Sequence, residues 1–370
     1  MGVFSLGVPS GMLTGYPCKS MDVGFPQNFV PNISEHFPSA AGFYEIIQGY
    51  SNQPIALLVL FLTASCVMIW RLQAMEHKGF EGTVLGTLIM PYCSGFANLV
   101  FAFVMSRTAS NGGLVIENCL VNNVTNLTLI LGVSSILGTS TGDAKRSGRS
   151  KVKPSSGLQR ISGLNVLFSL IALFLFTGTL WALAKDGTID FYDGLVLIAL
   201  FVFWQVLHVF EILKEKIRRN KDFQWSIVFD LIAIAASAYG IYYSTDHLVI
   251  WVSEAGSQYV GFAKLGWISG LLMVLPNALI ALYYARRGRQ DIVLSSQIGD
   301  GHICIPMCIG LFAVFNTIQV PDIFNVGIYV ILGAGVLHFL SVAFLKRIPR
   351  ILGFCLLGAY GFFFYKGIVH

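Results

Sequence analysis

Charged side chains are scarce in this sequence: only 12% of its 370 residues are Asp, Glu, Lys or Arg, whereas 55% are hydrophobic. A soluble domain usually carries about twice that charged fraction. The apolar residues are gathered in long runs without the alternation of a barrel strand, and helices of about 20 such residues are what cross a bilayer. The sequence therefore predicts a polytopic α-helical membrane protein and argues against a soluble enzyme.

The sequence also lacks the residue patterns that carry catalysis. It contains no paired carboxylates, no Ser/His/Asp set, no phosphate-binding loop and no cluster with metal-ligand spacing. Its seven cysteines form no disulfide framework, because all but Cys18 lie in apolar runs. Cys304 and Cys308 have His302 nearby, but a metal site would want more ligands in a less apolar setting, so we interpret them as packing residues. We therefore expect neither an enzyme nor a bound cofactor.

Ten apolar runs are long enough to span a bilayer. They lie near residues 55–73, 82–106, 113–137, 163–184, 190–212, 224–244, 257–285, 292–316, 323–345 and 349–367. Most of the 24 Lys and Arg residues fall in the loops after the first, third, fifth, seventh and ninth runs, and basic loops stay on the cytoplasmic side or its equivalent. Both termini are therefore expected on the outer side. Because topology accounts for the net charge of +5, no nucleic-acid partner is expected.

Polar and basic segments divide the chain into three expected parts. Residues 1–53, rich in Pro, Gly, Ser and aromatic residues, are interpreted as an extension on the outer side. Residues 54–213 would form a first half of five helices with a flexible basic loop at 138–162, and residues 214–370 a second half of five. An odd number of spans inverts the second half relative to the first. The expected fold is therefore all-α, with ten transmembrane helices in two inverted five-helix repeats.

Two lone amides occupy matching places in these halves. Asn98 and Asn277 lie in apolar runs, 179 residues apart, and each is close to a proline or glycine that weakens a helix. Inverted repeats whose interrupted helices meet at the midplane are typical of secondary transporters. We therefore expect irregular backbone near 91–97 and 273–277, and we expect the two amides to face each other.

Several segments resemble a known family. ENCLVNNVTNLTLILG (117–132) aligns with SSQIGDGHICIPMCIG (295–310), and each follows an amide-bearing segment, YCSGFANLVFAF or MVLPNALIALYYARRGRQDI. In this order and spacing the segments resemble the motifs of the cation/Ca²⁺ exchanger superfamily, in particular its ten-helix sodium/calcium exchangers. Residues 186–204 and the segment LKRIPRILGFCLLGAYGFFFY also resemble that family's helices 5 and 10. The resemblance implies a central core built from helices 2, 3, 7 and 8.

The chemistry departs from that family at its centre. In the exchangers one acidic residue per repeat holds Ca²⁺ and Na⁺ at the midplane, and the matching positions here are Asn98 and Asn277. Other polar positions of the second repeat carry Met273, Val274, Gly301 and Cys304. Ca²⁺ prefers six to eight oxygens with several carboxylates, and two positive charges without countercharge are costly near the bilayer centre. Ca²⁺ exchange is therefore doubtful, and a monovalent cation is the better fit.

Six residues are candidates to line an ion or substrate site: Ser94, Asn98, Asn123, Asn126, Asn277 and Asp300. Asp300 lies between two glycines, one residue from a ligand position of the family, and has either a site-lining role or a structural or rim role. Glu117 is expected at the membrane edge, and Asp230 is as readily explained by pairing with a neighbouring helix. His208 and His338 are interpreted as packing residues. Buried amides also have a structural reading, because they can hydrogen-bond across helices.

Two functional hypotheses follow and stay open at this point. The first is a cation antiporter of altered selectivity, which would move a monovalent cation or a proton-coupled substrate past the amides, Ser94 and Asp300. The second is a transporter-derived protein that no longer transports and serves as a structural or regulatory subunit of a larger membrane complex. Membrane lipids are partners in both hypotheses, and other membrane-protein subunits are partners in the second.

Overall fold

The computed structural model describes residues 53–77, 90–107, 111–137, 156–216, 226–255, 264–286, 290–345 and 348–369. The chain divides into residues 1–50 and residues 51–370, and every described residue belongs to the second unit. The expected outer extension thus lies outside the described residues, except for Gln53.

Helices form at the apolar runs predicted from the sequence, because a helix satisfies all its backbone groups internally. The first half comprises α2 (Pro54–His77), α4 (Met90–Arg107), α5 (Gly113–Val124), η3 (Thr125–Ile130), α6 (Leu131–Leu137), α7 (Ser156–Leu183), η4 (Ala184–Asp186), β1 (Thr188–Ile189) and α8 (Phe191–Lys216). The second half comprises α9 (Ser226–Ala255), α10 (Leu265–Arg286), α11 (Gln290–Ile303), η6 (Cys304–Cys308), α12 (Ile309–Phe315), β2 (Ile318–Gln319), α13 (Phe324–Leu340), η7 (Ser341–Leu345) and α14 (Arg350–Val369). The segments η3 and η6 are π-helical and join the helices on either side without a break, η7 is π-helical and continues α13, and η4 is a 3-10 helix.

Six helical stretches among the described residues are long and apolar enough to cross a membrane. They are Pro54–Arg71, Gly113–Leu137, Val166–Asp186, Leu265–Arg286, Val293–Phe315 and Phe324–Leu345. Shorter apolar helices cover Gly95–Arg107 and Phe191–Leu207. The architecture is that of a polytopic helical membrane protein, and the crossing of the bilayer by all ten runs stays a prediction.

One boundary differs from the sequence-based expectation. The loop predicted at 138–162 ends earlier, because α7 already begins at Ser156. Leu158 and Ile161 extend the apolar pattern of the following run toward its N-terminus, and such a pattern favours helix over loop. Residues 138–155 of that loop lie outside the described residues.

The apolar side chains divide into a packed interior and an exposed outer surface. Phe101, Phe176 and Phe312 are completely or almost completely buried, whereas Phe229 on α9 and Ile351 on α14 are 75% and 78% exposed. Soluble proteins rarely expose large contiguous apolar patches, so a surface of this kind indicates contact with lipid.

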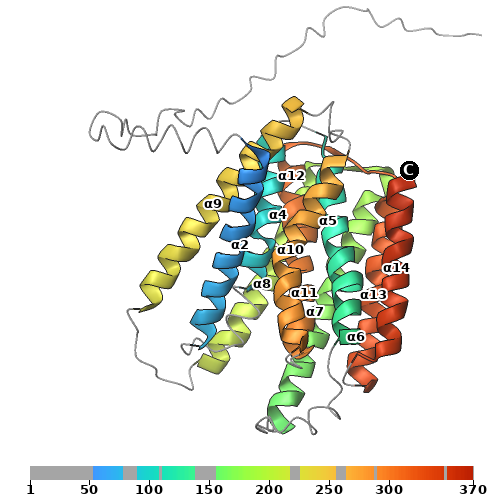
Figure 1. Cartoon of the computed structure of the whole chain (residues 1–370). Helices are drawn as coiled ribbons and strands as arrows, with labels where there is room; N and C mark the ends of the chain where they lie inside the picture. The colour runs from blue at the N-terminus through green and yellow to red at the C-terminus, as the bar shows by residue number, and fades with distance from the viewer. Residues whose placement is uncertain are drawn as a thin grey trace, which may run out of the picture. The chain divides into compact units, whose positions relative to one another are not determined.

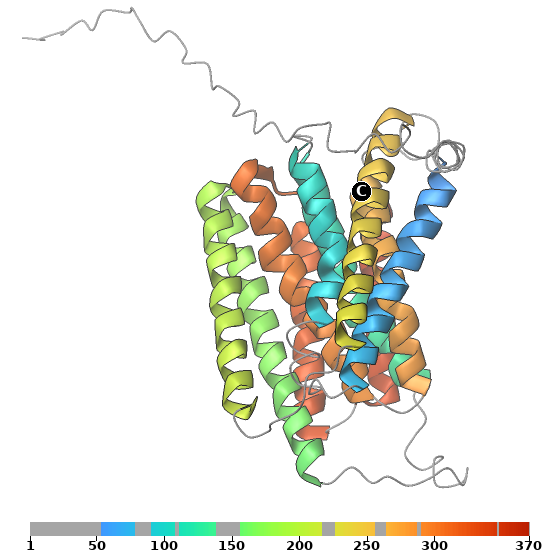
Figure 2. The ribbon, with the colours of Figure 1, turned by 90° about the vertical axis from the view of Figure 1, so that its left-hand side faces the viewer.

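The helices pack in pairs that correspond between the two halves. α2 packs chiefly on α9, and the two lie together at one side of the bundle (Figures 1 and 2). α5 packs on α10, and α4 packs on α11 and α12. In the same way, α8 packs on α12 and α14 packs on α6. These contacts come in pairs with the halves exchanged, which is what two repeats related by a two-fold axis would give.

Two close glycine crossings occupy corresponding places. A Cβ atom added to Gly310 would lie 3.0 Å from the carbonyl oxygen of Gly194, and one added to Gly353 would lie 2.8 Å from that of Gly132. The first crossing brings α12 onto α8 and the second brings α6 onto α14. Small residues let membrane helices approach this closely, and Gly132 and Gly310 are the last residues of the two aligned polar segments.

The prediction of irregular backbone near 91–97 and 273–277 is wrong. α4 is α-helical from Met90, with Pro91 in its first described turn, where a missing N–H costs little. α10 is α-helical throughout although it contains Pro276. The irregular backbone lies instead in the next helix of each half, at η3 and η6, which coincide in the alignment of 117–132 with 295–310. π-Helical segments are frequent at functional sites.

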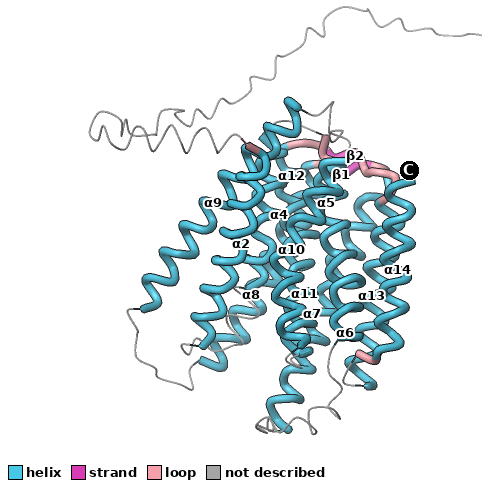
Figure 3. Tube along the Cα trace, in the orientation of Figure 1, coloured by secondary structure: helices cyan, strands magenta, loops and turns pink. Residues whose placement is uncertain are grey.

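A two-residue ladder joins connections of the two halves at one end of the bundle (Figure 3). β1 and β2 pair antiparallel, with Thr188 opposite Gln319 and Ile189 opposite Ile318. Both isoleucines are completely buried. Gly187 ends η4 with a φ of 87°, a left-handed conformation that glycine adopts without strain.

Candidate functional site

A buried carboxylate lies at the centre of the packed helices. Asp300 of α11 is completely buried, and its Oδ2 atom accepts hydrogen bonds from Nδ2 of Asn122 at 2.6 Å and from Nδ2 of Asn126 at 2.7 Å. The donors belong to α5 and η3, so the contact joins the two aligned polar segments. Hydrogen bonds to a carboxylate acceptor are among the stronger ones in proteins.

The arrangement repeats with the halves exchanged. In the alignment of 117–132 with 295–310, Asn122 coincides with Asp300 and Asn126 coincides with Cys304. Asn126 donates to Asp300, and Asn122 correspondingly donates to Sγ of Cys304 at 3.2 Å. The carboxylate therefore occupies one of two related positions, and the other position holds an amide.

Four amide groups of the first half present buried oxygens. Asn118 donates through Nδ2 to Oγ of Ser269 at 2.9 Å and to Sδ of Met273 at 3.4 Å, and Asn123 donates to the carbonyl oxygen of Cys119 at 2.7 Å. The Oδ1 atoms of Asn118, Asn122, Asn123 and Asn126 have no hydrogen-bond donor among the described residues. A buried acceptor without a partner costs about 1–3 kcal/mol, so this group of oxygens is suited to receive a cation or water.

Asn98 is the most isolated of these amides. It is completely buried on α4, and neither its Nδ2 nor its Oδ1 has a hydrogen-bond partner among the described residues. One turn earlier, a Cβ atom on Gly95 would meet Ile303 at 3.0 Å, so this face of α4 packs on α11. Asn277 is also buried, on α10. That Asn98 and Asn277 face each other stays a prediction.

The structure brings only some of the predicted site residues into contact. Asn126 and Asp300 touch directly, and Oδ1 of Asn123 lies 2.6 Å from where a Cβ atom of Gly301 would be. Ser94 lies in α4, but its side chain is outside the described part of the chain. The sequence analysis did not select Asn122, although its alignment with Asp300 was a signal that could have found it.

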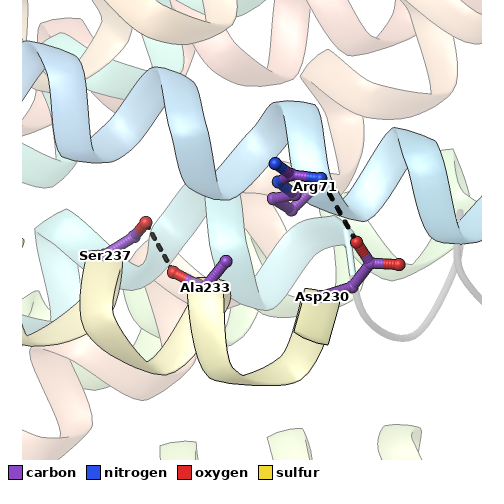
Figure 4. Close-up of polar contacts among 4 residues, drawn as sticks. All are labelled: Arg71, Asp230, Ala233 and Ser237. Carbon is purple, nitrogen blue, oxygen red and sulfur yellow. Dashed lines mark hydrogen bonds and ion pairs between the residues drawn. The ribbon is translucent and has the colours of Figure 1, made fainter. Parts of the chain in front are cut away.

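A second buried acid, Asp230, already has a basic partner. Oδ1 of Asp230 on α9 lies 3.5 Å from Nη1 of Arg71 on α2, and the carboxylate side chain is 1% exposed (Figure 4). The sequence left a functional role and pairing with a neighbouring helix equally open for Asp230, and this contact favours pairing. The pair joins the two helices that pack most extensively on each other.

Two histidines and Glu117 are further titratable groups in these helices. Nε2 of His338 lies 2.8 Å from the carbonyl oxygen of Leu127 in η3, as expected for a packing residue. Nε2 of His302 lies 2.8 Å from the carbonyl oxygen of Ser169 on α7. Glu117, in the second turn of α5, is partly buried against Gly266. Across the described residues, no group of three or more His, Cys, Asp or Glu side chains is placed to hold a metal ion.

Comparisons with known proteins show the family and the fold. A family model described as "Sodium/calcium exchanger protein" matches residues 54–210 and 229–367. Structures of the sodium-calcium exchanger NCX_Mj share the fold. The form soaked with 2.5 mM Na⁺ and 1 mM Sr²⁺ has a TM-score of 0.60 at 20% identity, covering 87% of this chain and 97% of that one. The form soaked with 2.5 mM Na⁺ and 0.1 mM Ca²⁺ has a TM-score of 0.57 at 20% identity, covering 82% and 93%. No curated protein sequence matches the chain.

Proposed function

The chain belongs to the sodium/calcium exchanger family, and from that premise we propose that it is an antiporter of a monovalent cation rather than of Ca²⁺. The observation that supports this most is a buried carboxylate, Asp300, held by two amides whose oxygens have no donor among the described residues. The proposal includes a site lined by Asn98, Asn123, Asn126, Asn277 and Asp300, with Ser94 and Asn122 beside them.

Charge balance selects a monovalent ion. One monovalent cation beside Asp300 leaves the buried site neutral. Ca²⁺ at the same place would leave one positive charge in the apolar interior, which is costly without a further anion. Asp230 does not supply that anion, because Arg71 already neutralises it.

The amides are arranged to receive a cation at their oxygens. Asn122 and Asn126 both donate their N–H groups to Asp300, so each amide is fixed in orientation before an ion arrives. A ligand set that is already oriented loses less conformational entropy on binding. Amide oxygens solvate the ion while the carboxylate neutralises it, which suits weak, reversible binding.

Transport would follow from the two-repeat architecture, which we include in the proposal. The corresponding π-helical segments, the paired glycine crossings and the paired contacts of Asn126 with Asp300 and Asn122 with Cys304 support it. In proteins built from inverted repeats, alternating access arises when one bundle rocks against the other around a fixed central site.

The alternative function is a transporter-derived subunit that does not transport. One observation favours it: Met273, Gly301 and Cys304 of the second half offer no side-chain oxygen, so the amide oxygens come mostly from the first half. Such a one-sided site would bind a cation weakly or not at all.

Flux measurements distinguish the two functions. The purified full chain is reconstituted into vesicles, and uptake of Li⁺, Na⁺, K⁺ and Ca²⁺ is measured against outward gradients of Na⁺, K⁺ and H⁺, with protein-free vesicles as the control. We expect flux of at least one monovalent ion and Ca²⁺ flux at the level of the control. Equal absence of flux for all ions, together with purification in a stable large complex, would support the subunit function instead.

A further inference from the structure

A histidine contacts the backbone of the π-helical segment η3. Nε2 of His338 on α13 lies 2.8 Å from the carbonyl oxygen of Leu127, and the ring is completely buried. A carbonyl oxygen only accepts hydrogen bonds, so Nε2 carries the hydrogen and donates it. Nδ1 of the same ring has no hydrogen-bond partner among the described residues. Within the described part of the chain, the bond to Leu127 is therefore the polar contact that orients this ring.

The carbonyl group of Leu127 lacks the donor that an α-helix would give it. In an α-helix the N–H group of Leu131 would donate to the carbonyl four residues earlier, which is that of Leu127. Here the N–H group of Leu131 is directed to the carbonyls of Asn126 and Thr128 instead. A buried carbonyl without a donor is costly, and the N–H group of His338 takes the place of the α-helical donor.

The segment η3 contains no residue that would force a π-helical turn by itself. It reads TNLTLI, with neither proline nor glycine, whereas the corresponding segment η6 contains Pro306. Proline lacks the N–H group of a regular helix, so the local sequence accounts for irregular backbone in the second half. In the first half the local sequence supplies no such cause, and the position of the turn depends on contacts with other helices.

Packing on both sides of η3 limits where the extra residue of the π-helical turn can sit. Before the segment, a Cβ atom on Gly270 of α10 would lie 2.8 Å from the carbonyl oxygen of Asn118. Directly after the segment, a Cβ atom on Gly132 would lie 3.0 Å from the carbonyl oxygen of Gly353. Because the second crossing follows η3 at once, the turn has room to shift only toward the N-terminal side.

We propose that His338 is a positioning residue of the cation site: its N–H group fixes the π-helical turn at η3 and thereby directs Asn126 toward Asp300. Asn126 immediately precedes Leu127, and its Nδ2 donates to Oδ2 of Asp300 at 2.7 Å. A shift of the turn by one residue would rotate Asn126 about the helix axis by about 100°, away from the carboxylate. The effect on η3 is independent of what the protein transports, whereas the effect on cation affinity rests on the proposed function.

Two substitutions separate the hydrogen-bond donor from the volume of the ring. His338→Gln keeps an N–H donor near the place of Nε2, whereas His338→Leu fills the space without a donor. We expect the unfolding temperature in detergent to stay near the wild-type value for His338→Gln and to fall for His338→Leu. Equal losses in the two variants would overturn the role of the donor.

A double-mutant cycle tests whether His338 acts through Asn126. His338→Leu should lower the unfolding temperature less in an Asn126→Ala background than in the wild type, because the contact with Asp300 is then already lost. Asn118→Ala makes the same change on the N-terminal side of η3 and is the matched control, so its effect should add to that of His338→Leu. Additive effects of His338→Leu and Asn126→Ala would overturn the positioning role.

Cation titrations connect this role to the proposed site. The unfolding temperature is followed as Li⁺, Na⁺ or K⁺ is added. His338→Leu should need about tenfold more cation for the same response, since the loss of one hydrogen bond to a carboxylate costs about that factor. His338→Gln should respond like the wild type. His247→Leu should do so as well, because Nδ1 of His247 contacts a carbonyl oxygen of its own helix, that of Tyr243 on α9.

The titrations and the cycle separate the two proposals. An unchanged cation response in His338→Leu would overturn the positioning role at the site. Absence of a cation response in every protein, including the wild type, would overturn the cation site, while less than additive losses in the cycle would leave the role of His338 in η3 standing.

A measurement on the wild type covers the case in which His338→Leu does not fold. The seven histidines are labelled with ¹⁵N, and solid-state NMR in lipid identifies His338 by the signals that disappear in His338→Gln. We expect Nε2 of His338 to carry a hydrogen. A bare Nε2 would overturn the inference, because it could not donate to the carbonyl oxygen of Leu127.

Discussion

Replacing Asp300 by Asn removes the one charge of the proposed site while keeping its shape. An amide oxygen at position 300 can still accept from Asn122 and Asn126, the two donors that now reach Oδ2 at 2.6 and 2.7 Å. The bonds lose their charge assistance, about 1 kcal/mol each, but an ionised group no longer has to be buried. The free energy of unfolding should therefore change little.

Asp300→Ala provides the contrast. One N–H group of each asparagine loses its acceptor, while Nδ2 of Asn122 still donates to Sγ of Cys304. Each unsatisfied donor costs about 1–3 kcal/mol, so the variant should be less stable by about 2–6 kcal/mol. Thermal unfolding in detergent should place wild type and Asp300→Asn together, with Asp300→Ala clearly below them.

Cation affinity should not follow stability. The Asp300→Asn variant should be about as stable as the wild type but should bind cations much more weakly. A unit charge at about 4 Å from a carboxylate contributes about 4 kcal/mol at an effective dielectric constant of 20. Because each 1.4 kcal/mol is a factor of ten, the affinity should fall by about 10³. The assay follows the unfolding temperature of each variant as Li⁺, Na⁺ or K⁺ is titrated, since a ligand that binds only the folded state raises it.

Asp322→Asn is the matched control, because it makes the same chemical change at an exposed carboxylate before α13. It should leave the cation dependence at the wild-type level. Unchanged cation stabilisation in Asp300→Asn would refute the assignment of Asp300 as the countercharge of the site.

Two other outcomes test the site and the fold. The unmodified protein should show no Na⁺-driven Ca²⁺ flux, and robust Ca²⁺ exchange by the wild type would contradict the proposed monovalent selectivity. The double variant Asn98→Glu with Asn277→Asp should gain measurable Ca²⁺ binding, because it adds two carboxylates. Gly353→Ala should lower the free energy of unfolding by about 1–3 kcal/mol, because its methyl group would overpack against the backbone of Gly132. Gly358→Ala on the same helix is the control: its methyl group meets nothing within 4 Å, so the free energy of unfolding should not change. Equal unfolding temperatures for these two alanine variants would show that the glycine crossing is not tightly packed.

Much of the fold could be predicted because membrane helices are specified locally. Long apolar runs leave the backbone no other way to satisfy its hydrogen bonds in lipid, so the helices fall where hydropathy placed them. The alignment of 117–132 with 295–310 brings the two π-helical segments and two of the crossing glycines into register, but it predicted neither feature. The positions of irregular backbone were wrong, because proline and glycine content does not by itself decide where a helix changes its turn.

The composition and the apolar runs of the sequence alone determined that the chain is a helical membrane protein. Only the tertiary structure decided that Asp230 is neutralised by Arg71, that Asp300 is held by Asn122 and Asn126, and that sulfur faces the amides. These contacts join residues far apart in the chain, and they depend on the rotation and depth of each helix against its neighbours. Rotation and depth are set by side-chain packing between helices, which no local pattern in one sequence specifies.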